Sequence, residues 1–172
     1  LLDIPMEPSG FPKNVPGRAP LLTSSNEVEN LNRLVHIMKQ AGGYVGLLGT
    51  QGTKFMLHSE TLLPVLRSIK QRGLIYVDSR STSRSLGPDL ASSIQLPKAF
   101  NNVFVDKEPS QEKIKNKLDE LERIAVKRRF AVGIAQPLPI TIEILSQWAK
   151  GLKTKQIALA PITAIVDKQS QR

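Results

Sequence analysis

Short apolar runs alternate along the chain with longer segments in which apolar residues recur at helical spacing. Each run is too short for a helix and is rich in aliphatic or β-branched residues, as buried strands are. The pattern predicts six strands, at 1–6, 44–48, 74–78, 102–106, 131–135 and 157–161. Regular alternation of strand and helix is typical of parallel strands joined by right-handed crossovers, so we expect an α/β sheet or barrel with its helices outside.

Four helices are predicted between these strands. Ser25 can cap the first, Ser59 and Ser110 open the second and third, and Thr141 begins the fourth. Glycines at 42, 43 and 73 end the first two. The apolar residues of each helix fall on one face, which we expect to pack in the core. These faces are Val28, Leu31, Leu34, Val35 and Met38; Leu62, Leu66 and Ile69; Ile114, Leu118, Leu121 and Ala125; and Ile142, Leu145, Trp148 and Leu152.

The stretch from Met6 to Thr23 contains prolines at 8, 12, 16 and 20, and it directly follows Pro5. Proline lacks the backbone N–H that helices and sheets require, so this stretch is predicted to be an irregular loop. It leaves the first predicted strand, and long ordered loops at strand exits often carry function.

Polar side chains lie at the ends of five predicted strands. In parallel α/β folds the site is built at the carboxyl ends of the strands, because the connecting loops meet there. We therefore predict that three carboxylates are catalytic candidates and that five further side chains bind ligand. The catalytic candidates are Glu7, Asp78 and Asp106; the ligand-binding candidates are Asp3, Thr50, Gln51, Arg80 and Gln136.

Structural roles compete with these functional ones. Asp78 precedes the segment SRSTSRS and can cap a helix or form a turn through nearby backbone amides. Arg80 can pair with Asp78 or Asp106 instead of meeting an anionic ligand. Asp106 and Glu108 can act as an acid and base or hold a metal, but an acidic pair before a Pro-Ser helix start is also typical of solvated capping.

Common catalytic motifs are missing from the sequence. His36 lies within a predicted helix and His58 at a helix start, so both are expected to be surface or partly packed residues. The sequence has no HExxH, GxGxxG or Walker-type loop and no cysteine, which excludes a thiolate zinc site and a cysteine nucleophile. The segment LLGTQGTKF lacks the GK[ST] ending that cradles phosphate.

Length and composition refine this picture. The 172 residues predict a single domain over 1–166 followed by a polar tail at 167–172. A net charge of +9 suits a polyanion, but scattered basic residues and only 5% aromatic residues argue against nucleic acid as a partner. No apolar run reaches the roughly 18 residues of a membrane span. The opening LLDIPM reads as a strand already under way, which predicts a segment upstream of Leu1.

Five segments, taken in order, resemble the divergent polysaccharide deacetylase family. They are PMEPSGFPKNVPG, LLTSSNEVENLNRL, GGYVGLLGTQGTKF, RGLIYVDSRSTSRS and GIAQPLPITIEILSQWAKGL. The resemblance implies a distorted (β/α) barrel of the polysaccharide-deacetylase type that lacks its N-terminal strand or strands in this chain. It also implies a periplasmic or cell-envelope setting, and hydrolysis in which a divalent metal ion activates water against an acetyl carbonyl.

The chain departs from the family pattern where relatives carry histidine. Asp3 stands before the PME motif, Gly49-Thr50-Gln51-Gly52 replaces Asn-His-Met-Gly, and Ala135-Gln136-Pro137 replaces Gly-His-Pro. The acidic pair of the family's first strand is expected upstream of Leu1. Thr and Gln are poor zinc ligands and do not titrate near neutrality. The resemblance therefore implies the family fold with its usual metal site dismantled.

Three functions follow as hypotheses. The first is a domain that binds a glycan or peptidoglycan-related carbohydrate with little or no hydrolysis and no cofactor. The second is a working hydrolase in which Asp3, Glu7, Asp78 and Asp106, with carboxylates from an upstream strand, hold Zn, Mn or Mg through oxygen ligands. The third is a basic module for anionic polymers, which rests on the charge of +9.

Overall fold

The computed structural model describes residues 1–169, and the chain divides into two compact units. Unit 1 is Leu1–Phe100 and unit 2 is Asn101–Arg172. Each has a hydrophobic core of its own. The single domain expected over 1–166 stays a prediction, and residues 170–172 of the expected tail lie outside the described residues.

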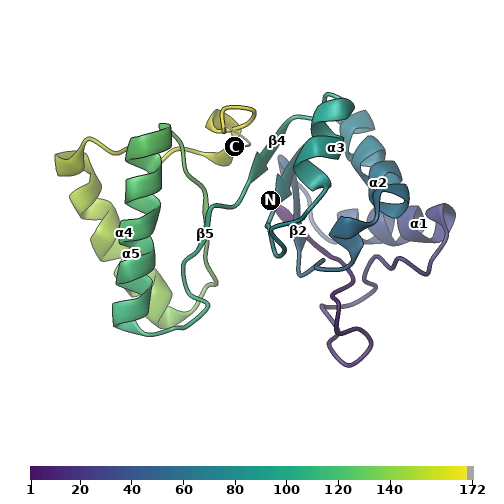
Figure 1. The fold of residues 1–172 in the computed structure, drawn as a ribbon, viewed down its shortest axis with the longest axis horizontal. Coiled ribbons are helices and arrows are strands. Elements are labelled where there is room, and N and C mark those ends of the chain that lie inside the picture. Colours follow the sequence, from purple (N-terminus) through teal and green to yellow (C-terminus); the bar gives the residue numbers. More distant parts are fainter. Residues whose placement is uncertain (170–172) are drawn as a thin grey trace. The chain divides into compact units, whose positions relative to one another are not determined.

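A four-stranded parallel sheet forms the centre of unit 1 (Figure 1). Neighbouring strands follow one another in sequence, so each connection is a crossover that carries a helix. Because all strands run the same way, their carboxyl ends meet at one edge. The strands, in spatial order, are β1 (Leu2–Pro5), β2 (Gly46–Thr50), β3 (Ile75–Asp78) and β4 (Lys98–Phe100).

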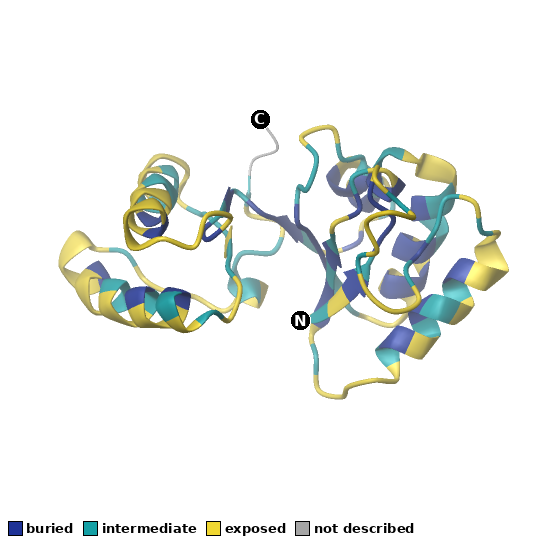
Figure 2. Ribbon diagram, turned by 90° about the horizontal axis from the view of Figure 1, so that it is seen from below, coloured by how far each residue is buried: buried dark blue, intermediate teal, exposed yellow. Residues whose placement is uncertain are grey.

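Helices cover this sheet on one side (Figure 1). They are α1 (Glu27–Met38), α2 (Ser59–Gln71) and α3 (Gly87–Ser93), with a short 3-10 turn η1 (Phe55–Leu57) before α2. Strand residues Ile4, Leu47 and Tyr76 are fully buried against helix residues such as Leu34 and Leu66. Figure 2 shows the same division on each helix: residues on the face toward the sheet are buried, and residues on the opposite face are exposed.

Unit 2 is smaller and is built on a two-stranded parallel sheet. Its strands are β5 (Val103–Phe104) and β6 (Gly133–Ile134), and its helices are α4 (Gln111–Arg128) and α5 (Pro139–Gly151), followed by the short turns η2 (Leu152–Lys155) and η3 (Ile162–Ala164). Val105, Ile114, Leu118 and Ile144 form its core. Ser110 caps α4 as predicted, with its hydroxyl accepting from the Lys113 amide at 3.4 Å.

The α/β class with parallel strands is confirmed. Among residues 1–169 the strands pair as two separate sheets, and no pairing closes either sheet into a barrel. The prediction that 6–23 lacks regular structure is also confirmed, since this stretch contains only turns and an isolated bridge between Met6 and Leu21. None of the described helices is long and apolar enough to span a membrane.

Some predicted elements were wrong. The strand expected at 157–161 is an irregular segment with Leu159 66% exposed, and the Ile157 amide bonds back to the carbonyl of Leu152 instead of to a strand. Two elements were missed: α3, which begins at a Gly-Pro pair, and the three-residue strand β4. Val28 and Ile142 were expected inward but are 67% and 51% exposed.

The first turn of α1 explains the outward position of Val28. Asn26, not Ser25, caps the helix by accepting from the Glu29 amide at 2.9 Å. The inward face carries Asn30 together with Leu34 and Ile37. The Asn30 side chain accepts from the Leu22 amide at 3.0 Å and donates to the Leu22 carbonyl at 2.9 Å, which joins the end of the Pro-rich loop to the helix.

Replacing Asn30 with alanine is expected to lower the free energy of unfolding by about 2 kcal/mol, because the amide and carbonyl of Leu22 lose their partners near the core. The matched control is Asn32→Ala, on the exposed side of the same helix, which is expected to change stability by less than about 0.5 kcal/mol. Urea denaturation measures both. Equal effects of the two substitutions would show that the Asn30 contacts contribute nothing.

Candidate functional site

Five of the eight predicted site residues lie at or just after the carboxyl edge of the unit 1 sheet. Glu7 follows β1, Thr50 ends β2 and Gln51 follows, and Asp78 ends β3 with Arg80 two residues on; Asp3 lies within β1, two residues before its end. Asp106 and Gln136 belong to unit 2. The sequence rule that site residues follow parallel strands therefore places most candidates at one edge, but their side chains differ in what they contact.

Glu7 joins three segments of unit 1. Its carboxylate accepts from the Thr23 amide at 2.6 Å, the Thr23 hydroxyl at 2.7 Å and the Lys54 ammonium at 2.7 Å. Its backbone carbonyl accepts from the amides of Lys54 and Phe55, both at 3.1 Å. Burial alone would raise the pKa of Glu7, but the bonds from Lys54 and Thr23 outweigh it and lower the pKa. Glu7 is thus an anchor for the Pro-rich loop and for the loop after β2.

Asp78 is completely buried and fixes the loop after β3. One carboxylate oxygen accepts from the Arg80 amide at 2.6 Å; the other accepts from the Ser85 hydroxyl at 2.6 Å and the Tyr76 hydroxyl at 3.2 Å. Burial raises the pKa of Asp78, and the bonds from Ser85, Arg80 and Tyr76 offset only part of that effect. The sequence predicted that Asp78 can form a turn through nearby backbone amides, and the bond from the Arg80 amide is such a contact.

Gly87, the first residue of α3, lets the helix approach this carboxylate. A methyl group at Gly87 would collide with Oδ2 of Asp78 and would lie 2.9 Å from the Tyr76 hydroxyl oxygen. The close approach therefore needs glycine at this position. The Arg80 side chain packs on the ring of Phe100, with its guanidinium carbon 3.7 Å from the ring centroid. The backbone of Arg80 is left-handed, at φ 49°.

Within unit 1, Asp3, Thr50 and Gln51 are predicted residues that keep access to solvent. Asp3 lies on β1 next to the buried Ile4, and Thr50 ends the neighbouring strand β2. Partial burial raises the pKa of Asp3, and the bonds from Thr50 and the Ile4 amide only partly counteract this. Gln51 is exposed on a left-handed backbone at φ 53°. Strands β1 and β2 and the residue after β2 thus expose a carboxylate, a hydroxyl and an amide.

In unit 2, Asp106 repeats the anchoring role. Its side chain is buried, and one oxygen accepts from the Gln136 amide at 2.8 Å and the Thr141 hydroxyl at 2.9 Å. Gln136 contributes its backbone to this contact and exposes its side chain. The Glu108 side chain is 75% exposed and lies 4.0 Å from the Lys113 ammonium, whereas Asp106 is buried and accepts from Gln136 and Thr141.

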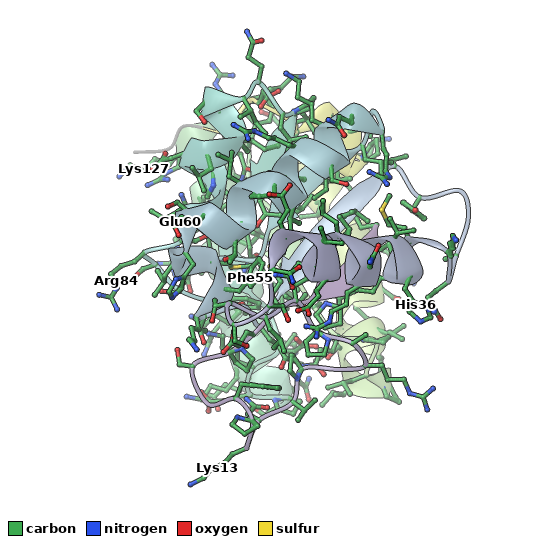
Figure 3. The ribbon with its side chains drawn as sticks, turned by 90° about the vertical axis from the view of Figure 1, so that its right-hand side faces the viewer. Lys13, His36, Phe55, Glu60, Arg84 and Lys127 are labelled. Atoms are coloured by element: carbon green, nitrogen blue, oxygen red, sulfur yellow. The ribbon has the colours of Figure 1, made fainter. Side chains whose placement is uncertain are left out.

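The donor set does not fit a resident divalent metal. Within residues 1–169 no group of three or more His, Cys, Asp or Glu side chains is arranged to hold an ion. His36 contacts Gln40 on the outer side of α1, where Figure 3 shows it projecting outward, and His58 is an exposed residue before α2. The oxygens of Glu7 and Asp78 already accept from N–H and O–H groups and from an ammonium group.

The structure also identifies residues that the sequence patterns did not single out. Thr23, Lys54, Ser85 and Thr141 supply side-chain donors to the buried carboxylates. The only sequence signal for them was their place in polar stretches after strands or at the start of a helix. No periodic pattern marks which donor reaches which acid.

Comparisons with known proteins support one family. A model of the family described as divergent polysaccharide deacetylase matches residues 1–166. The chain is similar to a solved structure described as the crystal structure of uncharacterized protein ATU2773 from Agrobacterium tumefaciens C58. The two share 34% sequence identity with a TM-score of 0.94, over 96% of this chain and 68% of the other. No curated protein matches the chain.

Glu7 is expected to make stability depend on pH. Its lowered pKa means that the ionised form stabilises the fold at pH values above the unfolded pKa near 4.3, and that this contribution is lost as pH falls through the folded pKa. Glu7→Gln should therefore cost about 2 kcal/mol at pH 7 and much less at pH 3. The control is Glu60→Gln, on the outside of α2 in Figure 3. A cost that is the same at both pH values would contradict the role of the Glu7 charge.

Gly87→Ala is expected to lower the free energy of unfolding by about 2 kcal/mol or more, because the added methyl group displaces the Asp78 carboxylate or the start of α3. The control is Gly151→Ala at the end of α5, where an added methyl group meets nothing within 4 Å. Thermal or urea denaturation measures both variants. Unchanged stability in Gly87→Ala would show that the close approach is not needed.

Proposed function

Because this chain belongs to the divergent polysaccharide deacetylase family, we propose that it binds a glycan at the carboxyl edge of the unit 1 sheet and hydrolyses it little or not at all. Family membership supports a role in carbohydrate metabolism, with a carbohydrate as the ligand. The degenerate site and a periplasmic or cell-envelope location are the further parts of the proposal, and the location rests on the family resemblance.

One observation carries the proposal: all three carboxylates expected to be catalytic serve as structural anchors. Glu7, Asp78 and Asp106 each accept two or more hydrogen bonds from the loops around them. A carboxylate that gave these bonds up to hold a metal or to take a proton from water would leave buried amides and hydroxyls without partners, which costs about 1–3 kcal/mol for each group.

The accessible groups at and near this edge suit binding. Asp3, Thr50 and Gln51 offer carboxylate, hydroxyl and amide groups, which donate to and accept from sugar hydroxyls. Asp3 and Thr50 lie on the paired strands β1 and β2, so the sheet holds their backbones in register before a ligand arrives. None of the three is needed to hold the loops that Glu7 and Asp78 anchor.

Acetate release separates binding from hydrolysis. We expect no acetate above the buffer background when the protein is incubated with acetylated xylan or N-acetylated chitooligosaccharides, with Zn, Mn or Mg added in turn. Calorimetric titration with the same glycans is expected to detect binding. Thr50→Val should weaken it about five- to tenfold through loss of one hydrogen bond. The control is Gln71→Ala, an exposed polar residue at the end of α2, which leads to the amino end of β3.

Metal-dependent acetate release that disappears in a folded Asp3→Ala variant would contradict the proposal and favour an active hydrolase with a carboxylate-rich centre. Binding that is equally strong in the wild type, Thr50→Val and Gln71→Ala would place the glycan elsewhere.

A further inference from the structure

The positive charge of unit 2 is concentrated at the ends of its two long helices. Residues 123–136 and 144–166 contain basic side chains and no Asp or Glu. Five of these side chains, which we call the basic end, are exposed at or just beyond the last turns of α4 and α5: Lys127, Arg128, Arg129, Lys150 and Lys153. Among residues 1–169, none of the five has a hydrogen-bond or ion-pair partner for its charged group.

Contacts between the helices bring these cations to the same end of unit 2. Glu122 on α4 accepts from the Trp148 indole of α5 at 2.7 Å and from the Lys155 ammonium, just past α5, at 2.8 Å. The two helices each follow a strand of one parallel sheet, so they run in the same direction, as Figure 1 shows. Their carbonyl ends therefore lie beside each other, and the acid between them is already paired.

One further basic group, Lys168, lies close to the end of α4. Lys168 places its ammonium 5.7 Å from the ring centroid of Phe130, which follows the C-cap of α4. Asp167 precedes Lys168, and it is engaged in an interaction of its own.

Helix stabilisation does not account for this many cations. A basic residue in the last turn interacts favourably with the helix dipole, but the effect is modest and fades within that turn. Lys153 lies beyond the last residue of α5. Arg129 occupies the left-handed C-cap of α4 at φ 71°, a position that favours glycine, so the chain keeps a cation where its backbone conformation is unfavourable.

We propose that the basic end binds an acidic glycan, a polysaccharide that carries carboxylate or phosphate groups along its length. Several separate, solvated cations on one end match a polymer with repeated charges better than a single small anion, because each contact releases a counterion from the polymer. The glycan nature of the polymer rests on the proposed function, and the charge requirement rests on the basic end itself.

The test compares two triple variants with equal net charge. Lys127→Gln, Arg128→Gln and Lys153→Gln remove cations of the basic end; Lys39→Gln, Arg67→Gln and Lys115→Gln remove the same residue types from exposed positions elsewhere. The probe is polygalacturonate, with its fully methyl-esterified form as the neutral counterpart, and affinity is measured over a range of NaCl concentrations. We expect the first variant to bind polygalacturonate at least about tenfold more weakly, with the slope of log affinity against log salt shallower by about two.

The control variant is expected to bind polygalacturonate as the wild type does, and the esterified polymer should not distinguish the two variants. Equal weakening in both variants, or an affinity that does not change with salt, would overturn the proposal. Tighter binding to phosphatidylglycerol vesicles than to polygalacturonate would also overturn it, in favour of a lipid surface.

The outcome is separable from that of the sheet-edge proposal. If neutral glycans do not bind and Thr50→Val has no effect, the sheet edge fails as a binding site, while a selective loss in the first triple variant still supports the basic end. If the triple variants behave alike while Thr50→Val weakens neutral glycan binding, the basic end fails and the sheet edge stands.

Discussion

The fold depends on buried carboxylates that hold the loops at the strand exits. A parallel sheet leaves each strand through a long connection, and the backbone groups of that connection need partners where they pass below the surface. Glu7, Asp78 and Asp106 meet this need after β1, β3 and β5, each by accepting N–H and O–H groups from residues farther along the chain. A single acid thereby fixes the path of a segment that has no regular structure.

The proposed lack of hydrolysis at the sheet edge follows from this constraint. A carboxylate that organises a loop is charged or hydrogen-bonded for structural reasons, and using it as a metal ligand or general base would release the loop it organises. Two effects oppose each other at Asp78. Burial raises its pKa, and hydrogen bonds from three donors lower it only in part, so the pKa stays raised. A raised pKa at a strand end is commonly a mark of an active site. Here complete burial and a full set of internal partners give it a structural cause.

The sequence alone predicted the parallel α/β class and the position of most strands and helices, because periodicity follows from which faces are buried. It failed where that signal is short or interrupted. Strand β4 has three residues, α3 begins with Gly-Pro, and the apolar segment 157–161 has no strand to pair with among residues 1–169. The inward face of α1 was misjudged at Val28 because the polar Asn30 is buried to bind the backbone of Leu22.

The sequence predicted where these polar residues lie in the sheet better than what they contact. The rule that loops meet at the carboxyl ends of parallel strands depends only on topology, which periodicity reveals, so it placed Glu7, Thr50, Gln51, Asp78 and Arg80 at one edge of unit 1. Whether an acid faces solvent or an internal donor depends on contacts such as Lys54 with Glu7, which join residues 47 positions apart. Such long-range pairings produce no pattern in the local sequence. The exposed cations of unit 2 do produce one, because they lie in stretches of sequence that contain no acidic residue. Local sequence therefore carries more information about where exposed positive charge lies in this chain than about which donors its carboxylates contact.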